Sequence, residues 1–177
     1  LWEHRLPHGA LCCQRLRNGN TLITTNYEIR EVTPANQVAF THSGSRGGLI
    51  FSAQRLANGH TLYGTYNGWM YELDRKGKEV KSYRIPQPSA GLATVEVLPG
   101  GHLLMALTRQ NKVVELDRTG KEVWQCSVDQ PTTVARLPNG HLFVGSHSNN
   151  RILEMDRGGK VVWEQRTEGQ IFRVRVR

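Results

Sequence analysis

One ten-residue phrase recurs four times along this chain, and this repetition restricts the fold more than any other feature of the sequence. It reads ELDRKGKEVK at residues 72–81, ELDRTGKEVW at residues 115–124 and EMDRGGKVVW at residues 154–163, with a weaker copy, EVTPANQVAF, at residues 31–40. The copies start about 40 residues apart, a period that, with strand-forming composition, is typical of the blades of a β-propeller.

A second phrase precedes each copy and moves along the chain in step with it. Its four versions are RLRNGNTLIT, RLANGHTLYG, VLPGGHLLMA and RLPNGHLFVG. The central glycine follows an asparagine in three of them, and Asn-Gly favours the positive φ angle that tight hairpin turns need. We therefore expect a hairpin at each version and assign a structural role to Gly59 and Gly140.

Each unit of the repeat reads as four short strands joined by tight turns. In the last unit the expected strands are residues 133–137, 142–146, 151–156 and 161–166. Strands of about five residues with short connections have normal hairpin dimensions. No segment combines a sustained helical period with capping residues, so we expect no helix. The predicted fold class is all-β, a β-propeller of four-stranded antiparallel blades.

Four complete blades are expected, at residues 11–48, 49–91, 92–131 and 132–170. Residues 1–8 match the fourth strand of a unit and residues 171–177 match the first, so each end of the chain holds an orphan strand. We expect residues 1–177 to be a single propeller domain or a fragment of a longer ring. Because unpaired strand edges invite pairing with another chain, self-association through the terminal strands is also expected.

The fourth strands carry a recurring tryptophan that is expected to pack between neighbouring blades. A four-stranded sheet covers both of its faces only when blades stack on one another. Trp2, Trp124 and Trp163 share this register, and the last two are expected to be largely buried. Phe40 and Lys81 replace the tryptophan in two units. The sequence therefore predicts a less well sealed outer edge at those two blades.

The net charge of +8 does not by itself predict a nucleic-acid partner. Many of the lysines and arginines belong to the recurring DR-x-GK turn, which distributes them around the fold and favours a role in solubility. No RNA-binding signature or interleaved basic and aromatic patch occurs. No apolar run of eighteen residues occurs either, so no membrane span is expected.

The three cysteines, Cys12, Cys13 and Cys126, have neither the number of a disulfide framework nor the spacing of a metal site. Neighbouring cysteines on a strand point to opposite faces and rarely bond to each other. We expect buried free thiols.

The recurring phrases resemble the bacterial PQQ-like and arylsulfotransferase-like β-propeller repeats, over nearly the whole chain. The turn strand of the type LPNGNTL and the closing pattern E-x-D-x-x-G-K-x-x-W carry this resemblance, and ELDRTGKEVW looks like the tryptophan-docking motif of quinoprotein dehydrogenases. The resemblance implies structural roles for Asp74, Asp117 and Asp156. It also implies an extracytoplasmic location, in the periplasm or the cell envelope.

The resemblance also names two enzyme activities, and neither finds its site residues here. Quinoprotein enzymes of this kind hold pyrroloquinoline quinone (PQQ) and calcium with acidic and amide residues, whereas the sulfotransferases use a histidine nucleophile. The glutamates that open each copy recur at one register, as do three of the seven histidines, which favours the scaffold: Glu31, Glu72, Glu115, Glu154, His60, His102 and His141. The histidines are expected to bond to their own turns. We predict no cofactor and no metal, and PQQ and calcium remain alternatives without supporting residues.

One face of the propeller is predicted to hold any ligand site. We call it the loop face, because it gathers the connections from second to third strands and from one blade to the next, where the copies diverge; the opposite face is the turn face. Ligand sites favour variable loops on a rigid framework. Aromatic and guanidinium groups suit a sugar, a quinone or an anion. The candidates are Arg46, Tyr66, Trp69, Arg109, His147 and Arg151.

These observations favour a non-catalytic propeller that acts as a binding or protein-interaction scaffold, with a protein partner or a small ligand on the loop face. The alternatives are an enzyme of the quinoprotein dehydrogenase or arylsulfotransferase type, and a purely structural repeat domain. No catalytic motif of the G-x-S-x-G or H-E-x-x-H kind occurs. No catalytic residue is therefore assigned.

Overall fold

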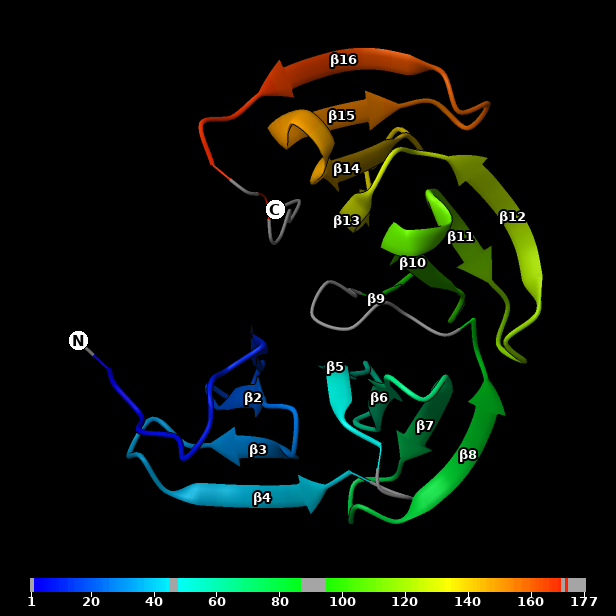
Figure 1. Ribbon diagram of the computed structural model, residues 1–177. Helices are drawn as coiled ribbons and strands as arrows, with labels where there is room; N and C mark the ends of the chain where they lie inside the picture. Colours follow the sequence, from blue (N-terminus) through cyan, green and yellow to red (C-terminus); the bar gives the residue numbers. More distant parts are fainter. Residues whose placement is uncertain (1, 45–47, 87–94, 170, 172–177) are drawn as a thin grey trace. The chain divides into compact units, whose positions relative to one another are not determined.

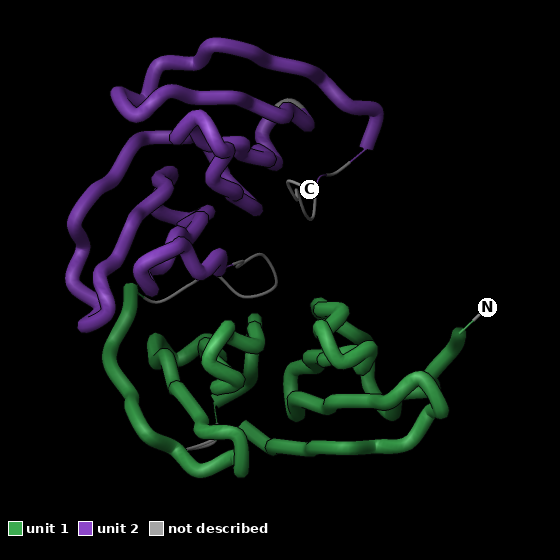
Figure 2. Tube along the Cα trace, turned by 180° about the vertical axis from the view of Figure 1, so that it is seen from behind, with its two compact units in different colours: residues 1–87 green, residues 88–177 purple. Residues whose placement is uncertain are grey.

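The computed structural model describes residues 2–44, 48–86, 95–169 and 171, which are almost entirely strands and turns (Figure 1). The chain divides into two compact units, residues 1–87 and residues 88–177 (Figure 2). We call them unit 1 and unit 2 and describe each by itself. Each unit contains two four-stranded antiparallel sheets whose strands follow one another in sequence order. The predicted blades of an all-β propeller are therefore confirmed.

Unit 1 holds the first two blades. The strands of the first are β1 (Cys12–Arg15), β2 (Thr21–Thr24), β3 (Glu28–Val32) and β4 (Val38–Ser43), and those of the second are β5 (Ile50–Arg55), β6 (Thr61–Thr65), β7 (Trp69–Leu73) and β8 (Glu79–Arg84). The Asn-Gly turns of the second recurring phrase join the first and second strands of these blades in hairpins, as predicted. In the second blade, for example, Gly59 N donates to Leu56 O at 2.9 Å.

Unit 2 holds the third and fourth blades. Their strands are β9 (Val95–Val97), β10 (Leu103–Leu107), β11 (Lys112–Leu116), β12 (Glu122–Ser127), β13 (Pro131–Arg136), β14 (Leu142–Ser146), β15 (Arg151–Met155) and β16 (Val161–Arg166). No helix was expected, but the structure has two three-residue 3-10 helices, η2 (Thr108–Gln110) and η3 (Ser148–Asn150). Each connects the second strand of a blade to the third. Asn111, which follows η2, and Asn150, the last residue of η3, both have positive φ.

The recurring glutamate occupies the same structural position in all four blades. Each third strand pairs with its fourth strand through a register shift just after this glutamate, so the glutamate lies opposite the tryptophan position. A bulge of this kind adds twist and re-aims side chains. The four cross-strand pairs are Glu31 with Phe40, Glu72 with Lys81, Glu115 with Trp124 and Glu154 with Trp163.

The recurring histidines bond to these glutamates, which corrects the expectation that they bond to their own turns. His60 Nδ1 is 2.7 Å from Glu72 Oε1, and the same pair joins His102 to Glu115 at 2.8 Å. His141 lies 2.7 Å from Glu154 and, with Asn139, lowers the pKa of that carboxyl. The histidine side chain thus crosses from the second strand to the third, and the glutamate register belongs to the scaffold.

The core of each unit lies between its two blades. In unit 1 it joins Leu22 and Ile29 of the first blade to Tyr63, Tyr71 and other side chains of the second. Burial is deepest in second strands such as β6 and β10, where every residue is buried, and lowest in the fourth strands, such as the fully exposed β16. Face-to-face packing of blades within each unit is therefore the source of the core, as the repeat predicted.

The two ends of the chain are described only in part. Residues 2–8 form no strand; instead Asn36 Nδ2 donates to Glu3 O at 2.7 Å, and His4 Nδ1 lies 2.8 Å from Asn36 Oδ1. Ile171 is buried, and Thr132 Oγ1 donates to its carbonyl at 2.7 Å. The rest of the expected terminal strand, residues 172–177, lies outside the described residues. Self-association through the ends stays a prediction.

Two details of the sequence-based expectation are wrong. Trp163 is 45% exposed, and its ring stacks on Phe143 at a distance of 6.1 Å. Cys13 is exposed, whereas Cys12 and Cys126 are half-buried, and all three are free thiols. Burial raises the pKa of the Cys126 thiol, which favours its protonated form.

A histidine that does not recur, His42 in β4, lies in the seam between the blades of unit 1. Its Nε2 is 3.3 Å from the Tyr63 hydroxyl, and the two rings are 5.3 Å apart. Burial lowers the pKa of His42, and the charge of Glu79 opposes this shift only in part. The packed seam therefore favours the neutral imidazole.

Acidification should weaken unit 1 through His42. The pKa of His42 is lower in the folded chain than the ordinary histidine value of 6.5, so the unfolded chain binds more protons near and below that pH. The free energy of unfolding should therefore decrease as the pH is lowered through this range. Urea unfolding across about pH 8 to pH 5 tests this on the native chain and on His42→Phe, which keeps a ring against Tyr63. The native chain should lose more stability on acidification than the variant. Parallel pH curves would contradict this role.

Candidate binding groove

In each unit, the first strand of the second blade ends in an arginine that bonds to the first blade. In unit 2, Arg136 donates to Glu115 Oε2 at 2.6 Å and to Gly140 O at 3.0 Å, and its guanidinium lies 5.9 Å from the Trp124 ring. The side chains of Arg136 and Glu115 are each only 13% exposed. Trp124 Nε1 also donates to Arg157 O at 3.2 Å. We call this set of contacts the blade clamp.

Unit 1 has the same clamp with phenylalanine in place of tryptophan. Arg55 donates to Glu31 Oε2 at 2.6 Å and to Gly59 O at 3.0 Å, and lies 5.5 Å from the Phe40 ring. Phe40 has one ring fewer than tryptophan and no N–H group. It therefore cannot donate to Arg75 O, the counterpart of the Arg157 carbonyl that Trp124 reaches in unit 2.

Backbone contacts between first strands accompany both clamps. Gln14 accepts from Arg55 N at 2.7 Å and donates to Arg55 O at 3.2 Å. In unit 2, Glu96 takes the equivalent place and accepts from Arg136 N at 2.8 Å. Burial raises the pKa of Glu96, and this bond to Arg136 opposes the rise. An uncharged amide thus forms the equivalent contact beside the open position in unit 1.

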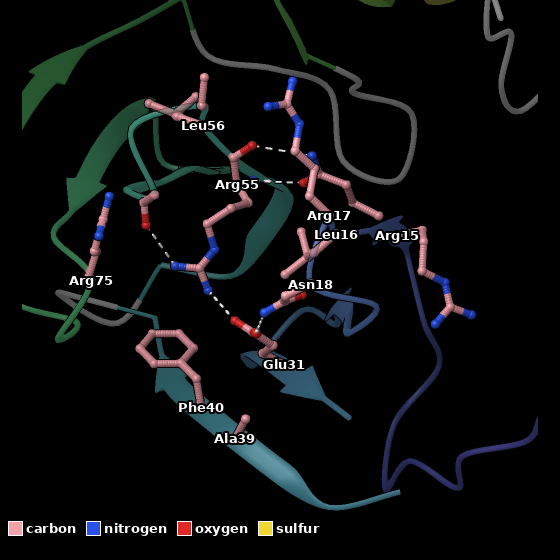
Figure 3. A pocket seen from close by; sticks show the side chains of 13 residues that line it. Arg15, Leu16, Arg17, Asn18, Glu31, Ala39, Phe40, Arg55, Leu56 and Arg75 are labelled. Carbon is pink, nitrogen blue, oxygen red and sulfur yellow. Dashed lines mark hydrogen bonds and ion pairs between the residues drawn. The ribbon is translucent and has the colours of Figure 1, made fainter. Parts of the chain in front are cut away.

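A groove of about 690 Å³ lies beside Phe40 on the turn face of unit 1 (Figure 3). The apolar lining includes Leu16, Phe40 and Leu56, all half-buried. The sequence predicted a less well sealed edge where tryptophan is lost, and the groove lies beside Phe40, one of these two positions. That the lost tryptophan is its cause stays a prediction. The equivalent edge at Lys81 stays a prediction.

Arginines give this groove an excess of positive charge. The charged side chains that line it are Arg15, Arg17, Arg55, Arg75 and Glu31. Arg55 is paired with Glu31, the sole acidic side chain of the described lining. The other three arginines meet no carboxylate in this lining, and a guanidinium carries five N–H donors. The groove is thus suited to negatively charged groups.

Two of these arginines are held by turn carbonyls. Arg75 donates from Nε and from one terminal nitrogen to Asn58 O, at 3.1 and 2.9 Å, and Arg15 donates to Gly19 O at 2.8 Å. Gly59, with φ of +86°, leaves the space beside Arg75 Nε that a Cβ would occupy. The bonds of Arg75 use only part of its guanidinium, which leaves N–H groups for a ligand, whereas the Arg15 guanidinium also lies 5.7 Å from the Trp2 ring.

The turn that carries Arg75 is fixed by Asp74. Asp74 Oδ1 accepts from Lys76 N at 2.8 Å and from Lys78 N at 2.9 Å, and the Lys78 bond is the main cause of a lowered Asp74 pKa. Asp117 holds the matching turn of unit 2, where Thr119 lowers its pKa. Asp156 accepts from Lys160 N at 2.9 Å. The recurring aspartate therefore fixes the backbone of the turn that carries the following arginine.

The loop-face candidates fall in both units, and several are in contact with other side chains. In unit 1, Arg84 covers the Trp69 ring at 4.4 Å, and Tyr66 lies 5.5 Å from Phe51. In unit 2, Arg109 is exposed in η2, His147 precedes η3, and Arg151 lies 3.5 Å from Glu164. Arg46 lies outside the described residues. A ligand site on the loop face stays a prediction.

Sequence reasoning missed the groove because Arg75 belongs to the recurring DR-x-GK turn and was assigned to solubility, and no role was assigned to Arg15, Arg17 or Arg55. The signal that marks it is the combination of a lost tryptophan, Phe40, with a retained clamp arginine, Arg55. In the described part of the chain, no cluster of three or more histidine, cysteine, aspartate or glutamate side chains is arranged to hold a metal ion.

Residues 66–177, more than half of the chain, match the PQQ-type repeat family described as outer membrane protein assembly factor BamB. The chain belongs to this family. The arylsulfotransferase-like part of the expected resemblance stays a prediction. Among curated proteins, none matches the chain in sequence. In the described residues, no helix is long and apolar enough to cross a membrane.

Solved structures share the fold at low sequence identity. A protein of unknown function from Bacteroides caccae superposes with a TM-score of 0.78 at 18% identity, over 97% of this chain and 68% of that one. Streptogramin B lyase follows at 0.71 and 14%, over 92% and 56%. BBS1N, solved in complex with ARL6DN, gives 0.70 and 15%, over 96% and 57%. The chain thus spans little more than half of the last two, and these similarities concern the fold alone.

Proposed function

We propose that this chain is a non-catalytic propeller that acts as a protein-interaction scaffold. The observation that carries the proposal is the arginine-lined groove on the turn face of unit 1, which is open where Phe40 replaces tryptophan. Two comparisons support it: the family is described as an assembly factor, and BBS1N was solved in complex with ARL6DN. Proteins of this fold are thus known in assemblies with other proteins.

The bonding of the titratable side chains also supports binding over catalysis. The histidines after the turn glycines are bonded to glutamates of the same blade, as in His60 with Glu72, and this pattern recurs in both units. The turn aspartates accept backbone N–H groups. A side chain held by the same partner in successive repeats stabilises the repeat, which favours the groove over these side chains as the place for specific function.

We place this binding role at the bacterial cell envelope, because the family description names the outer membrane. No cofactor is part of the proposal. The quinoprotein dehydrogenase and arylsulfotransferase alternatives are tested directly by dye reduction with added PQQ and calcium, and by sulfate transfer from an aryl sulfate. Turnover in either assay would overturn the non-catalytic role.

A photo-crosslinking residue placed in the groove should capture a protein partner in cells. Ala57→p-benzoylphenylalanine puts the crosslinker on an exposed lining position, and Val123→p-benzoylphenylalanine puts it on an exposed strand of unit 2. Immunoblots after irradiation should show a discrete adduct for the first variant and none for the second. Adducts of equal strength at both positions, or none at the groove, would contradict a scaffold that uses this groove.

A further inference from the structure

We propose that the turn-face groove of unit 1 binds an extended protein segment rich in acidic side chains. Its carboxylates pair with Arg17 and Arg75, and its apolar side chains cover Leu16, Leu56 and Phe40. This inference rests on the proposed function and names the chemistry of the partner that the groove selects.

The balance of charge in the lining is the first reason. Glu31 is already paired with Arg55 at 2.6 Å and is held among half-buried side chains, so it neither repels an incoming anion strongly nor satisfies another arginine. Arg17 and Arg75 are both exposed and line the same groove. An acidic segment thus meets uncompensated positive charge, which raises both its affinity and its rate of association.

The geometry of Arg75 is the second reason. Its double bond to Asn58 O fixes the guanidinium before a ligand arrives, so little side-chain freedom remains to be lost on binding. In Figure 3, Arg75 lies on one side of the Arg55–Glu31 pair and Arg15 and Arg17 lie on the other. A ligand that reaches both sides must carry negative groups several bonds apart, as the successive side chains of an extended peptide do.

The apolar lining favours a protein segment over a nucleic acid. The Arg55 guanidinium covers one face of the Phe40 ring at 5.5 Å, so a base cannot stack on that face. Leucine side chains complement Leu16 and Leu56 better than sugars or phosphates do. The volume of about 690 Å³ also lies within the range of specific ligand sites.

The equivalent place in unit 2 carries a different side chain. There Trp124 occupies the clamp position of Phe40 and donates to Arg157 O at 3.2 Å. Arg118 makes the same kind of turn contact, to Gly100 O, as Arg75 makes to Asn58 O. Arg118 therefore provides a matched control that carries the same charge and turn contact outside the groove.

Fluorescence anisotropy of a short labelled peptide in which glutamate and leucine alternate tests the proposal on the full chain. Binding should weaken about tenfold for the double variant Arg17→Gln, Arg75→Gln, on the order expected for two exposed charge pairs. Arg118→Gln should leave it unchanged. Raising the salt concentration should also weaken it, because exposed pairs are screened. A peptide with glutamine in place of glutamate should bind markedly less.

Filling the groove is the second test, and it does not depend on charge. Phe40→Trp restores the clamp tryptophan, so the variant should lose peptide binding while its thermal midpoint stays the same or rises. Equal binding of the glutamine peptide, or unchanged binding by Phe40→Trp, would overturn the inference. Tighter binding of an oligonucleotide of similar length would assign the groove to nucleic acid instead. A groove crosslink to a partner that binds the Arg17, Arg75 variant normally would overturn the inference but keep the proposed function.

Discussion

Replacing Trp124 with alanine should lower the free energy of unfolding by about 3 kcal/mol, at the low end for large aromatic side chains because the ring is only half-buried. The ring packs against the core between the third and fourth blades, receives the guanidinium of Arg136 at 5.9 Å and donates to Arg157 O. Its loss therefore removes apolar packing, a cation–π contact and a hydrogen bond between two blades.

The repeat supplies the control for this prediction. Trp163 holds the same register in the fourth blade but is 45% exposed, so Trp163→Ala should cost no more than about 1 kcal/mol. Urea unfolding of both variants, followed by far-ultraviolet circular dichroism, measures the difference. Equal losses for the two variants would show that the ring stabilises its own strand rather than the seam between blades.

The regular part of this fold could be predicted from the sequence because each element is coded locally and then repeated. The Asn-Gly turns specify hairpins through the φ angle of Gly59 and its counterparts, and the strands β14 and β16 have the bounds that the last unit predicted. The bond from each recurring histidine to a glutamate was missed. It joins positions about a dozen residues apart, which meet because β6 pairs with β7: His60 directly precedes Thr61, the partner of Leu73.

The candidate site was harder to predict because it depends on an absence. A phenylalanine in place of a tryptophan marks a weak seam in the sequence, but the groove becomes visible only when Arg75 and Leu56 of the next blade are in place around Phe40. Turn arginines alone gave no such signal, since Arg75 and Arg118 look alike in the repeat and differ only in what lies beside them. A ligand site was predicted on the loop face because the loop sequences differ between the repeats. In the structure, Arg84 covers the ring of Trp69, one of the residues predicted there.

Replacing Arg136 with alanine should cost about 3 kcal/mol or more, because the change removes one partner of a mostly buried ion pair. Glu115 would keep its bond to His102 at 2.8 Å but would lose the Arg136 contact at 2.6 Å in surroundings that leave only 13% of its side chain exposed. Gly140 O would lose a donor, and the Trp124 ring would lose its cation.

Arg151→Ala is the matched control, since Arg151 reaches Glu164 only at 3.5 Å and Glu164 is exposed, a pair worth about 0.5 kcal/mol. Urea unfolding of both single variants should separate them clearly. The double variant Arg136→Ala, Glu115→Gln should cost less than the sum of its two single changes, because the second change removes the carboxylate that the first leaves unpaired. Additive costs, or an Arg136→Ala loss no larger than that of Arg151→Ala, would mean that the clamp contributes no coupling between the blades and that packing of Trp124 alone joins them.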